Sequence, residues 1–118
     1  MKILLDENLD HRLRQRLGTH EVFTASYMGW DGLKNGKLLE AAELGGFELL
    51  ITGDQSLAYE QNLLGRRLAV IALSSIEWRI LVGHLPQIVA AIDHAVPGSL
   101  QAVDCGRFSR KKAPPTER

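Results

Sequence analysis

Two apolar runs in this chain each end on acidic residues. Residues 2–5 lead into Asp6 and Glu7, and residues 48–53 lead into Asp54. Apolar runs without alternation predict strands covered on both faces, as in a parallel sheet flanked by helices. Ligands of such sheets bind beyond the carboxyl ends of the strands, so we expect Asp6 and Asp54 to face one crevice. Two carboxylates brought together repel each other unless a cation or a shared proton compensates, which indicates a metal site.

Each of these acids also has a purely structural interpretation. An acid just after a strand caps the following helix or completes a turn, and Thr52-Gly53-Asp54 has good turn chemistry. Glu7 either reaches the crevice as a further metal ligand or favours a helix N-terminus through the macrodipole. The presence of both aspartates at the ends of strands that should be neighbours favours a site.

Further polar residues are candidates for the same crevice. Glu40, in the second predicted helix, is a candidate metal ligand, whereas Glu43 is expected on the solvated face of that helix. Asn35 is a helix cap, a neutral oxygen ligand, or both. Candidates to orient water or phosphate, or to guide a nucleic-acid backbone, are Asn35, Gln55, Asn62, Arg12 and Lys34. Trp30 and Tyr59 either stack on unpaired bases or pack in the core.

Composition limits the class of protein. The chain has 118 residues, 45% of them hydrophobic and 24% charged, with zero net charge, which is typical of one soluble domain. No apolar run approaches the ~20 residues of a membrane span, and no signal peptide is recognisable, so we expect a cytoplasmic protein with no membrane partner. The single cysteine, Cys105, excludes an internal disulfide and a cysteine-based zinc site.

The C-terminal segment differs from the rest of the chain. Residues 107–118 contain five basic groups, one acid and two prolines. Such a segment is too polar to bury a core, so we expect a disordered tail that aids solubility or attracts phosphates. Residues 1–106 then form the folded domain.

The order of predicted elements is that of an α/β protein. Strands are expected at residues 2–6, 20–24, 48–52, 68–73 and 100–104. Helices are expected at residues 9–17, from the cap at Asn35 to residue 44, at 57–62 and at 77–96, with Pro86 either kinking the last helix or opening a second one. This alternation predicts a three-layer α/β/α sandwich with a mainly parallel sheet and right-handed crossovers.

Three segments together resemble a family of small bacterial PIN-like proteins. They are residues 4–9 (LLDENL), 29–39 (GWDGLKNGKLL) and 50–57 (LITGDQSL), and the likeness runs from Met1 to about Leu73. The family is regarded as toxins of toxin–antitoxin pairs and is similar to the VapC-type ribonucleases. The resemblance implies a PIN-like fold, one or two Mg²⁺ or Mn²⁺ ions, cleavage of single-stranded RNA, and a small protein antitoxin as partner. It places Asp6 and Asp54 on metal-binding, catalytic positions.

Two departures from the family pattern leave an inactive relative as an alternative. Many relatives carry acids where this chain has Asn35 and Ser56. Glu40 or Glu7 would have to substitute for them as ligands, because Mg²⁺ prefers anionic oxygen. Without such a ligand, the chain would be a partner-binding module, with residues 76–85 forming a homodimer contact.

A phosphoacceptor receiver-like domain is a further alternative. Asp6 and Glu7 after the first strand, Asp54 after the third and Ser74 after the fourth match three features of such domains. The lysine expected after the last strand is missing, because the chain reads Val103-Asp104-Cys105 there.

Overall fold

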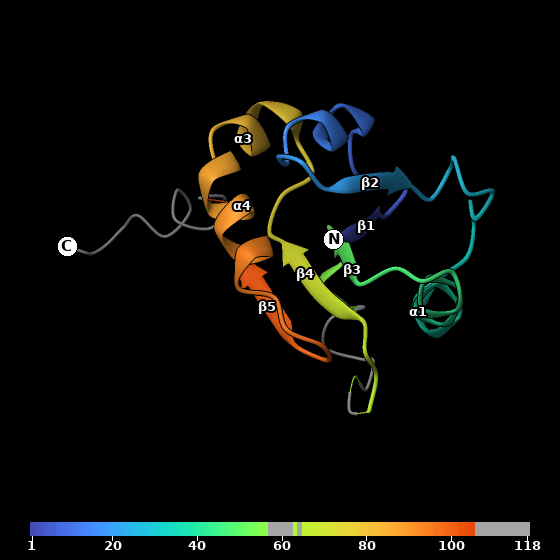
Figure 1. The fold of residues 1–118 in the computed structure, drawn as a ribbon. Coiled ribbons are helices and arrows are strands. Elements are labelled where there is room, and N and C mark those ends of the chain that lie inside the picture. The colour runs from blue at the N-terminus through green and yellow to red at the C-terminus, as the bar shows by residue number, and fades with distance from the viewer. Residues whose placement is uncertain (57–62, 64, 106–118) are drawn as a thin grey trace.

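A single parallel sheet organises the protein. The computed structural model describes residues 1–56, 63 and 65–105. Five strands lie in the order β2-β1-β3-β4-β5, and every neighbouring pair is parallel (Figure 1). The strands are β1 Lys2–Leu5, β2 Glu21–Thr24, β3 Leu49–Thr52, β4 Ala69–Leu73 and β5 Leu100–Val103. The predicted parallel-sheet α/β fold is therefore confirmed.

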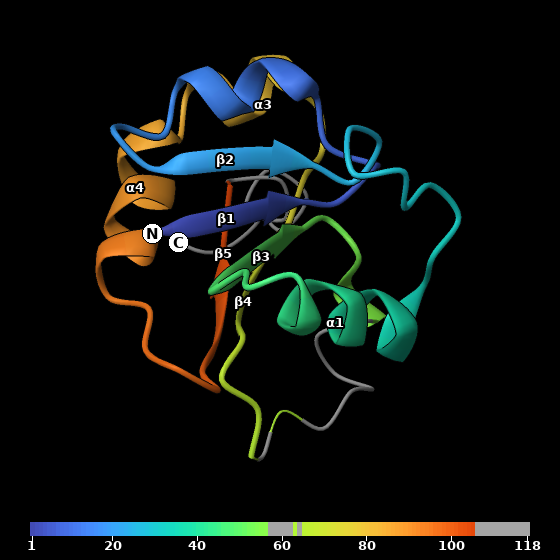
Figure 2. The ribbon, with the colours of Figure 1, turned by 45° about the vertical axis from the view of Figure 1, so that its right-hand side comes forward.

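Helices cover both faces of this sheet. They are the 3-10 helix η1 His11–Gln15 and the α-helices α1 Asn35–Leu44, α3 Trp78–Val82 and α4 Leu85–Asp93. Figure 2 shows α1 on one side of the sheet and η1, α3 and α4 on the other. The helix predicted at 57–62 and the tail predicted at 107–118 lie outside the described residues, as does Gly106.

The two faces of the sheet form two apolar clusters. Ile3 and Leu5 of β1 point into the cluster beneath η1, α3 and α4, whereas Leu4 points into the cluster beneath α1. All residues of β3 and β4 are buried, which explains their apolar runs without alternation. Burial of each leucine or isoleucine stabilises the fold by about 1.5–3 kcal/mol. These strands therefore hold the residues at their carboxyl ends in a fixed position.

The crossovers do not all have the same hand, so the prediction of uniformly right-handed crossovers is wrong. The steps β1→β2 and β4→β5 run in opposite directions along the sheet, yet their helices cover the same face. The hand of a crossover depends on the direction of its step along the sheet and on the face that its helix covers. Because these two crossovers differ in direction and share a face, they have opposite hands. A helix with its side chains is only about 10 Å across, about half the width of a five-stranded sheet, so η1 leaves the other half of this face open. Therefore α3 and α4 are needed to bury the rest of that face.

Two predicted helices have different bounds in the structure. Leu9, Leu13 and Leu17 are all buried as their spacing predicts, but only His11–Gln15 is helical. The long helix predicted over residues 77–96 is two helices, and Pro86 lies in the first turn of the second one.

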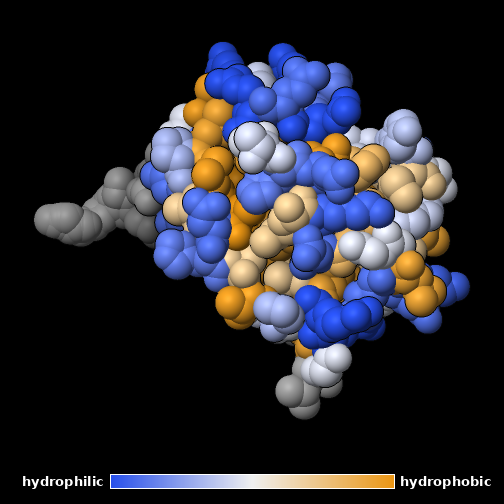
Figure 3. All heavy atoms as spheres, viewed as in Figure 1, coloured by the Kyte–Doolittle hydropathy of each residue, from blue (hydrophilic) through white to orange (hydrophobic). Residues whose placement is uncertain are grey.

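No described helix has the length and apolar content needed to cross a membrane. On the face drawn in Figure 3, hydrophobic side chains adjoin in a narrow strip that lies among hydrophilic ones. Within residues 76–85, Leu81 is fully buried, and Trp78, Ile80 and Leu85 pack against the core. Most of the apolar surface proposed for a homodimer contact is therefore used inside the subunit.

Candidate functional site at the carboxyl edge of the sheet

Asp6 and Asp54 line one hollow at the carboxyl edge of the sheet. Asp6 follows β1 directly, and its backbone N–H donates to the Ile51 carbonyl at 2.9 Å, which extends the pairing of β1 with β3. The hollow has a volume of about 120 Å³ and lies against the start of α1. It is lined by Asp6, Glu7, Asn8, Leu33, Lys34, Asn35, Leu38 and Asp54. The structure thus brings together five of the predicted site residues: Asp6, Glu7, Lys34, Asn35 and Asp54.

Thr52 connects the two aspartates. Its buried hydroxyl donates to Asp6 Oδ2 at 2.7 Å and accepts from the Asp54 backbone N–H at 2.9 Å. The other carboxylate oxygen of Asp6 accepts from the Glu7 N–H at 2.7 Å, and Asp6 is only 8% exposed. Sequence reasoning missed Thr52, although a hydroxyl within a fully buried strand must have hydrogen-bond partners and was therefore a detectable signal.

Asp54 and Glu7 each have a local structural role as well. Asp54 Oδ1 accepts from the Ser56 N–H at 2.9 Å and from the Ser56 hydroxyl at 2.6 Å, which realises the capping interpretation. Glu7 Oε1 accepts from the Gly32 N–H at 2.8 Å and so holds the loop before α1 beside the hollow. These bonds fix the direction of both carboxylates at the edge of the hollow.

Asn35 lies at the edge of the hollow but does not cap α1. Lys34 occupies the N-cap position, and Asn35 is the first helical residue, with φ at +51° and no side-chain capping bond. Asparagine tolerates this left-handed conformation better than most residues. The prediction of Asn35 as a cap is therefore wrong, whereas Lys34 places an exposed cation at the hollow.

The remaining candidates lie elsewhere. Glu40 is exposed on α1, because the helix turns Leu38 and Leu39 inward. Gln55 donates from Nε2 to the Leu73 carbonyl at 2.7 Å, which ties the end of β3 to the end of β4. Neither Glu40 nor Gln55 lines the hollow with the aspartates. Asn62 and Tyr59 lie outside the described residues.

Arg12 is exposed on η1, and its guanidinium also has partners within the protein. Its guanidinium donates to both carboxylate oxygens of Asp10, at 3.0 and 2.7 Å, and lies 4.6 Å from the ring centre of Trp78. The hydrogen bonds from Arg12 hold the pKa of Asp10 far below its ordinary range.

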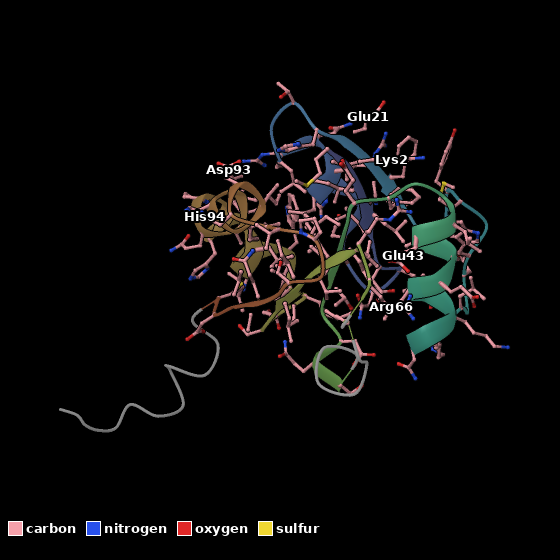
Figure 4. All side chains as sticks on the ribbon, turned by 60° about the horizontal axis from the view of Figure 1, so that its bottom comes forward. Lys2, Glu21, Glu43, Arg66, Asp93 and His94 are labelled. Carbon is pink, nitrogen blue, oxygen red and sulfur yellow. The ribbon has the colours of Figure 1, made fainter. Side chains whose placement is uncertain are left out.

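Two other side chains from the sequence analysis have structural partners. Trp30 packs edge-on against Phe47, with ring centres 5.8 Å apart, so the core-packing alternative holds. Glu43 is not on a solvated face, and Figure 4 shows it beside Arg66. It accepts from Arg66 Nη1 at 2.7 Å and from the backbone N–H groups of Arg67 and Leu68. Burial opposes ionisation of Glu43, but these hydrogen bonds outweigh it and lower its pKa below the ordinary value.

The hollow matches a hard divalent cation in ligand type but not in ligand number. Carboxylate and amide oxygens are the donors that Mg²⁺ and Mn²⁺ prefer, and the lining offers both kinds. Within residues 1–56, 63 and 65–105, however, no three acids, histidines or cysteines gather closely enough to hold a metal ion. A divalent cation at this hollow would therefore have to complete its coordination with oxygens of water or of a substrate.

Comparison with protein-family models, curated proteins and solved structures gives no match. The site is therefore characterised by its own geometry. Its central features are two acids from separate strands, Asp6 and Asp54, which line one hollow and are connected through Thr52.

Proposed function

We propose that this protein is a PIN-like, Mg²⁺- or Mn²⁺-dependent endoribonuclease and the toxin of a toxin–antitoxin pair, with a small protein antitoxin as its partner. The observation that carries the proposal is that Asp6 and Asp54 line one hollow at the carboxyl edge of a parallel sheet. The three segments that resemble the PIN-like family support it, because residues 4–9, 29–39 and 50–57 all contribute to the lining of this hollow.

The chemistry assigned to the site is hydrolysis of a phosphodiester bond. A divalent cation, when bound, supplies an activated water and stabilises the charge that develops on the phosphate. Asp6 and Asp54 are the ligands of that cation in our proposal, with Glu7 beside them. Thr52 positions the Asp6 carboxylate through its 2.7 Å hydrogen bond. Lys34 attracts the phosphate, and the Asn35 amide donates to a phosphate oxygen.

One observation favours a different candidate, a receiver-like phosphoacceptor. The strand order β2-β1-β3-β4-β5 is that of flavodoxin-like folds, to which receivers belong. In a uniformly right-handed sheet of this order, the helices after β4 would cover the same face as α1, but α3 and α4 cover the opposite one. The hydroxyl of Ser74 accepts from the Cys105 N–H at 2.8 Å, and Asp104 stands where a lysine is expected. We therefore favour the nuclease, and an acid-labile phosphate on Asp54 after phosphodonor treatment would favour the receiver.

The test is cleavage of single-stranded RNA with Mn²⁺ by the wild type, Asp6→Asn and Asp93→Asn. Asp93 is an exposed residue at the end of α4 (Figure 4), so its substitution makes the same chemical change away from the hollow. We expect cleavage by the wild type and by Asp93→Asn, and a loss of more than about 10-fold in Asp6→Asn, since even outer-shell changes at metal sites cost that much.

Two outcomes would contradict the proposal. Equal cleavage by the wild type and Asp6→Asn would assign the activity to a contaminant or another site. No cleavage by any of the three proteins, with no rise in melting temperature on addition of Mn²⁺, would favour the partner-binding module, because a cation that binds the folded state must stabilise it.

A further inference from the structure

A second hollow lies next to the first at the same edge of the sheet. Its volume is about 300 Å³, and it lies between the ends of β3 and β4 and the start of α3. It is lined by Asn8, Gly53, Ser74, Ser75, Ile76, Glu77 and Ile80. Asn8 lines both hollows, so a ligand in the aspartate hollow can continue into this one without leaving the surface.

The lining of the second hollow suits a neutral ligand that forms hydrogen bonds. It offers hydroxyl, amide and carboxylate groups, and none of the described residues that line it is a lysine, arginine or histidine. A phosphate would therefore meet an acid, Glu77, without a compensating cation. A sugar hydroxyl can both donate and accept, and it matches this combination of groups.

Ser75 provides independent evidence for a ligand. The residue is only 4% exposed, and its hydroxyl oxygen accepts from the Glu77 N–H at 3.2 Å. Among the residues that the structure describes, no acceptor for the Ser75 hydroxyl proton is found. Ser75 lines the hollow, so a group that enters the hollow and accepts this proton completes the hydrogen bonding of the hydroxyl.

Gly53 shapes the wall of this hollow. A Cβ atom at residue 53 would overlap Ile76 Cγ2, so only glycine lets Ile76 lie this close to the strand end. Ile76 is 47% exposed, and with Ile80 it gives the hollow an apolar side. An apolar wall opposite polar groups suits the face of a sugar or base.

We infer that the second hollow is a nucleoside subsite that binds the ribose next to the scissile phosphate and selects RNA over DNA. The Ser75 hydroxyl donates to the ribose 2′-hydroxyl, and the Glu77 carboxylate accepts from it. The 2′-hydroxyl is the group by which proteins distinguish RNA from DNA at a given position. This inference rests on the proposed nuclease function and names the substrate group that its site recognises.

The test compares a short single-stranded RNA with DNA of the same sequence, in cleavage with Mn²⁺ and in binding with EDTA present. Ser99→Ala is the matched control, because Ser99 Oγ also accepts a backbone N–H at 3.2 Å but belongs to the opposite edge of the sheet, just before β5. We expect Ser75→Ala to lose about 10-fold in RNA binding and cleavage, as expected for one hydrogen bond, and to leave DNA binding unchanged. Glu77→Gln is the second variant if Ser75→Ala does not fold.

The two readouts separate failure of the subsite from failure of the nuclease function. If the wild type cleaves RNA but binds and cleaves DNA equally well, the subsite is overturned and the proposed nuclease function stands. Ser75-dependent preference for RNA in binding, with no cleavage, would support the subsite and overturn the nuclease. An equal loss for RNA and DNA in both variants, or no binding of either nucleic acid, would overturn the subsite.

Discussion

The Thr52 hydroxyl should be a main determinant of stability at the carboxyl edge of the sheet. Thr52→Val keeps the shape of the side chain but removes its hydrogen bond to Asp6 Oδ2 and the acceptor of the Asp54 N–H. Loss of a hydrogen bond to a charged group lowers the free energy of unfolding by about 1.5–3 kcal/mol, and loss of the hydrogen bond from the Asp54 N–H lowers it by about 1 kcal/mol more. The methyl group of valine recovers up to about 0.8 kcal/mol.

The net expectation is a destabilisation of about 2–3 kcal/mol. For a domain of this size, that lowers the melting temperature by roughly 8–12 °C. The measurement is urea denaturation followed by circular dichroism. Thr24→Val is the control, because Thr24 Oγ1 also accepts a backbone N–H, from Tyr27 at 3.0 Å, and Thr24 likewise ends a strand of the sheet. We expect the control to lose about 1 kcal/mol.

A double-mutant cycle with Asp6→Ala isolates the contact between the two side chains. If Thr52 and Asp6 are coupled as the 2.7 Å distance indicates, the double mutant will be destabilised by about 1 kcal/mol or more less than the sum of the two single-mutant destabilisations. Additive losses, or a Thr52→Val variant no less stable than Thr24→Val, would refute the assignment of Thr52 as the residue that positions Asp6.

Two further predictions follow from titratable groups away from the site. Glu43→Gln should destabilise the protein by about 1–2 kcal/mol at pH 7, because Glu43 accepts charge-assisted hydrogen bonds. Folding lowers the pKa of Glu43, so its contribution to the free energy of unfolding is present above the ordinary pKa of 4.5 and is lost as the pH falls through the lowered pKa. The stabilities of the wild type and Glu43→Gln in urea denaturation should therefore converge at acidic pH. Burial raises the pKa of the Cys105 thiol, and so a thiol reagent at pH 8 should label the native protein at least about 10-fold more slowly than the urea-unfolded chain. Equal labelling rates would contradict the burial of Cys105.

Local patterns in the sequence predicted most of the elements. The apolar runs became β3 and β4, all of whose residues are buried. The helix predicted to follow a cap at Asn35 and to end before Gly45 is present, and it runs from Asn35 to Leu44. These features depend on neighbouring residues, so they are visible in a single sequence.

The partners of polar side chains could not be predicted in this way. Glu43 was expected on a solvated helix face, yet it binds Arg66, and the exposed Arg12 binds Asp10, a partner that the sequence did not indicate. Glu40 shows the opposite case, because it is exposed on α1 rather than near Asp6. A charged residue on a helix has several solvated positions of similar energy, so the three-dimensional neighbours decide between them.

The order of residues along the chain is enough to predict which segments become strands and that acids follow two of them, because burial and turn chemistry act over a few residues. Folding of the whole chain places β1 beside β3, brings the Thr52 hydroxyl to Asp6, 46 positions earlier in the chain, and puts α3 and α4 on the same face as η1. These outcomes depend on how the whole apolar surface of the sheet is covered at once, a requirement that no single segment of the chain expresses.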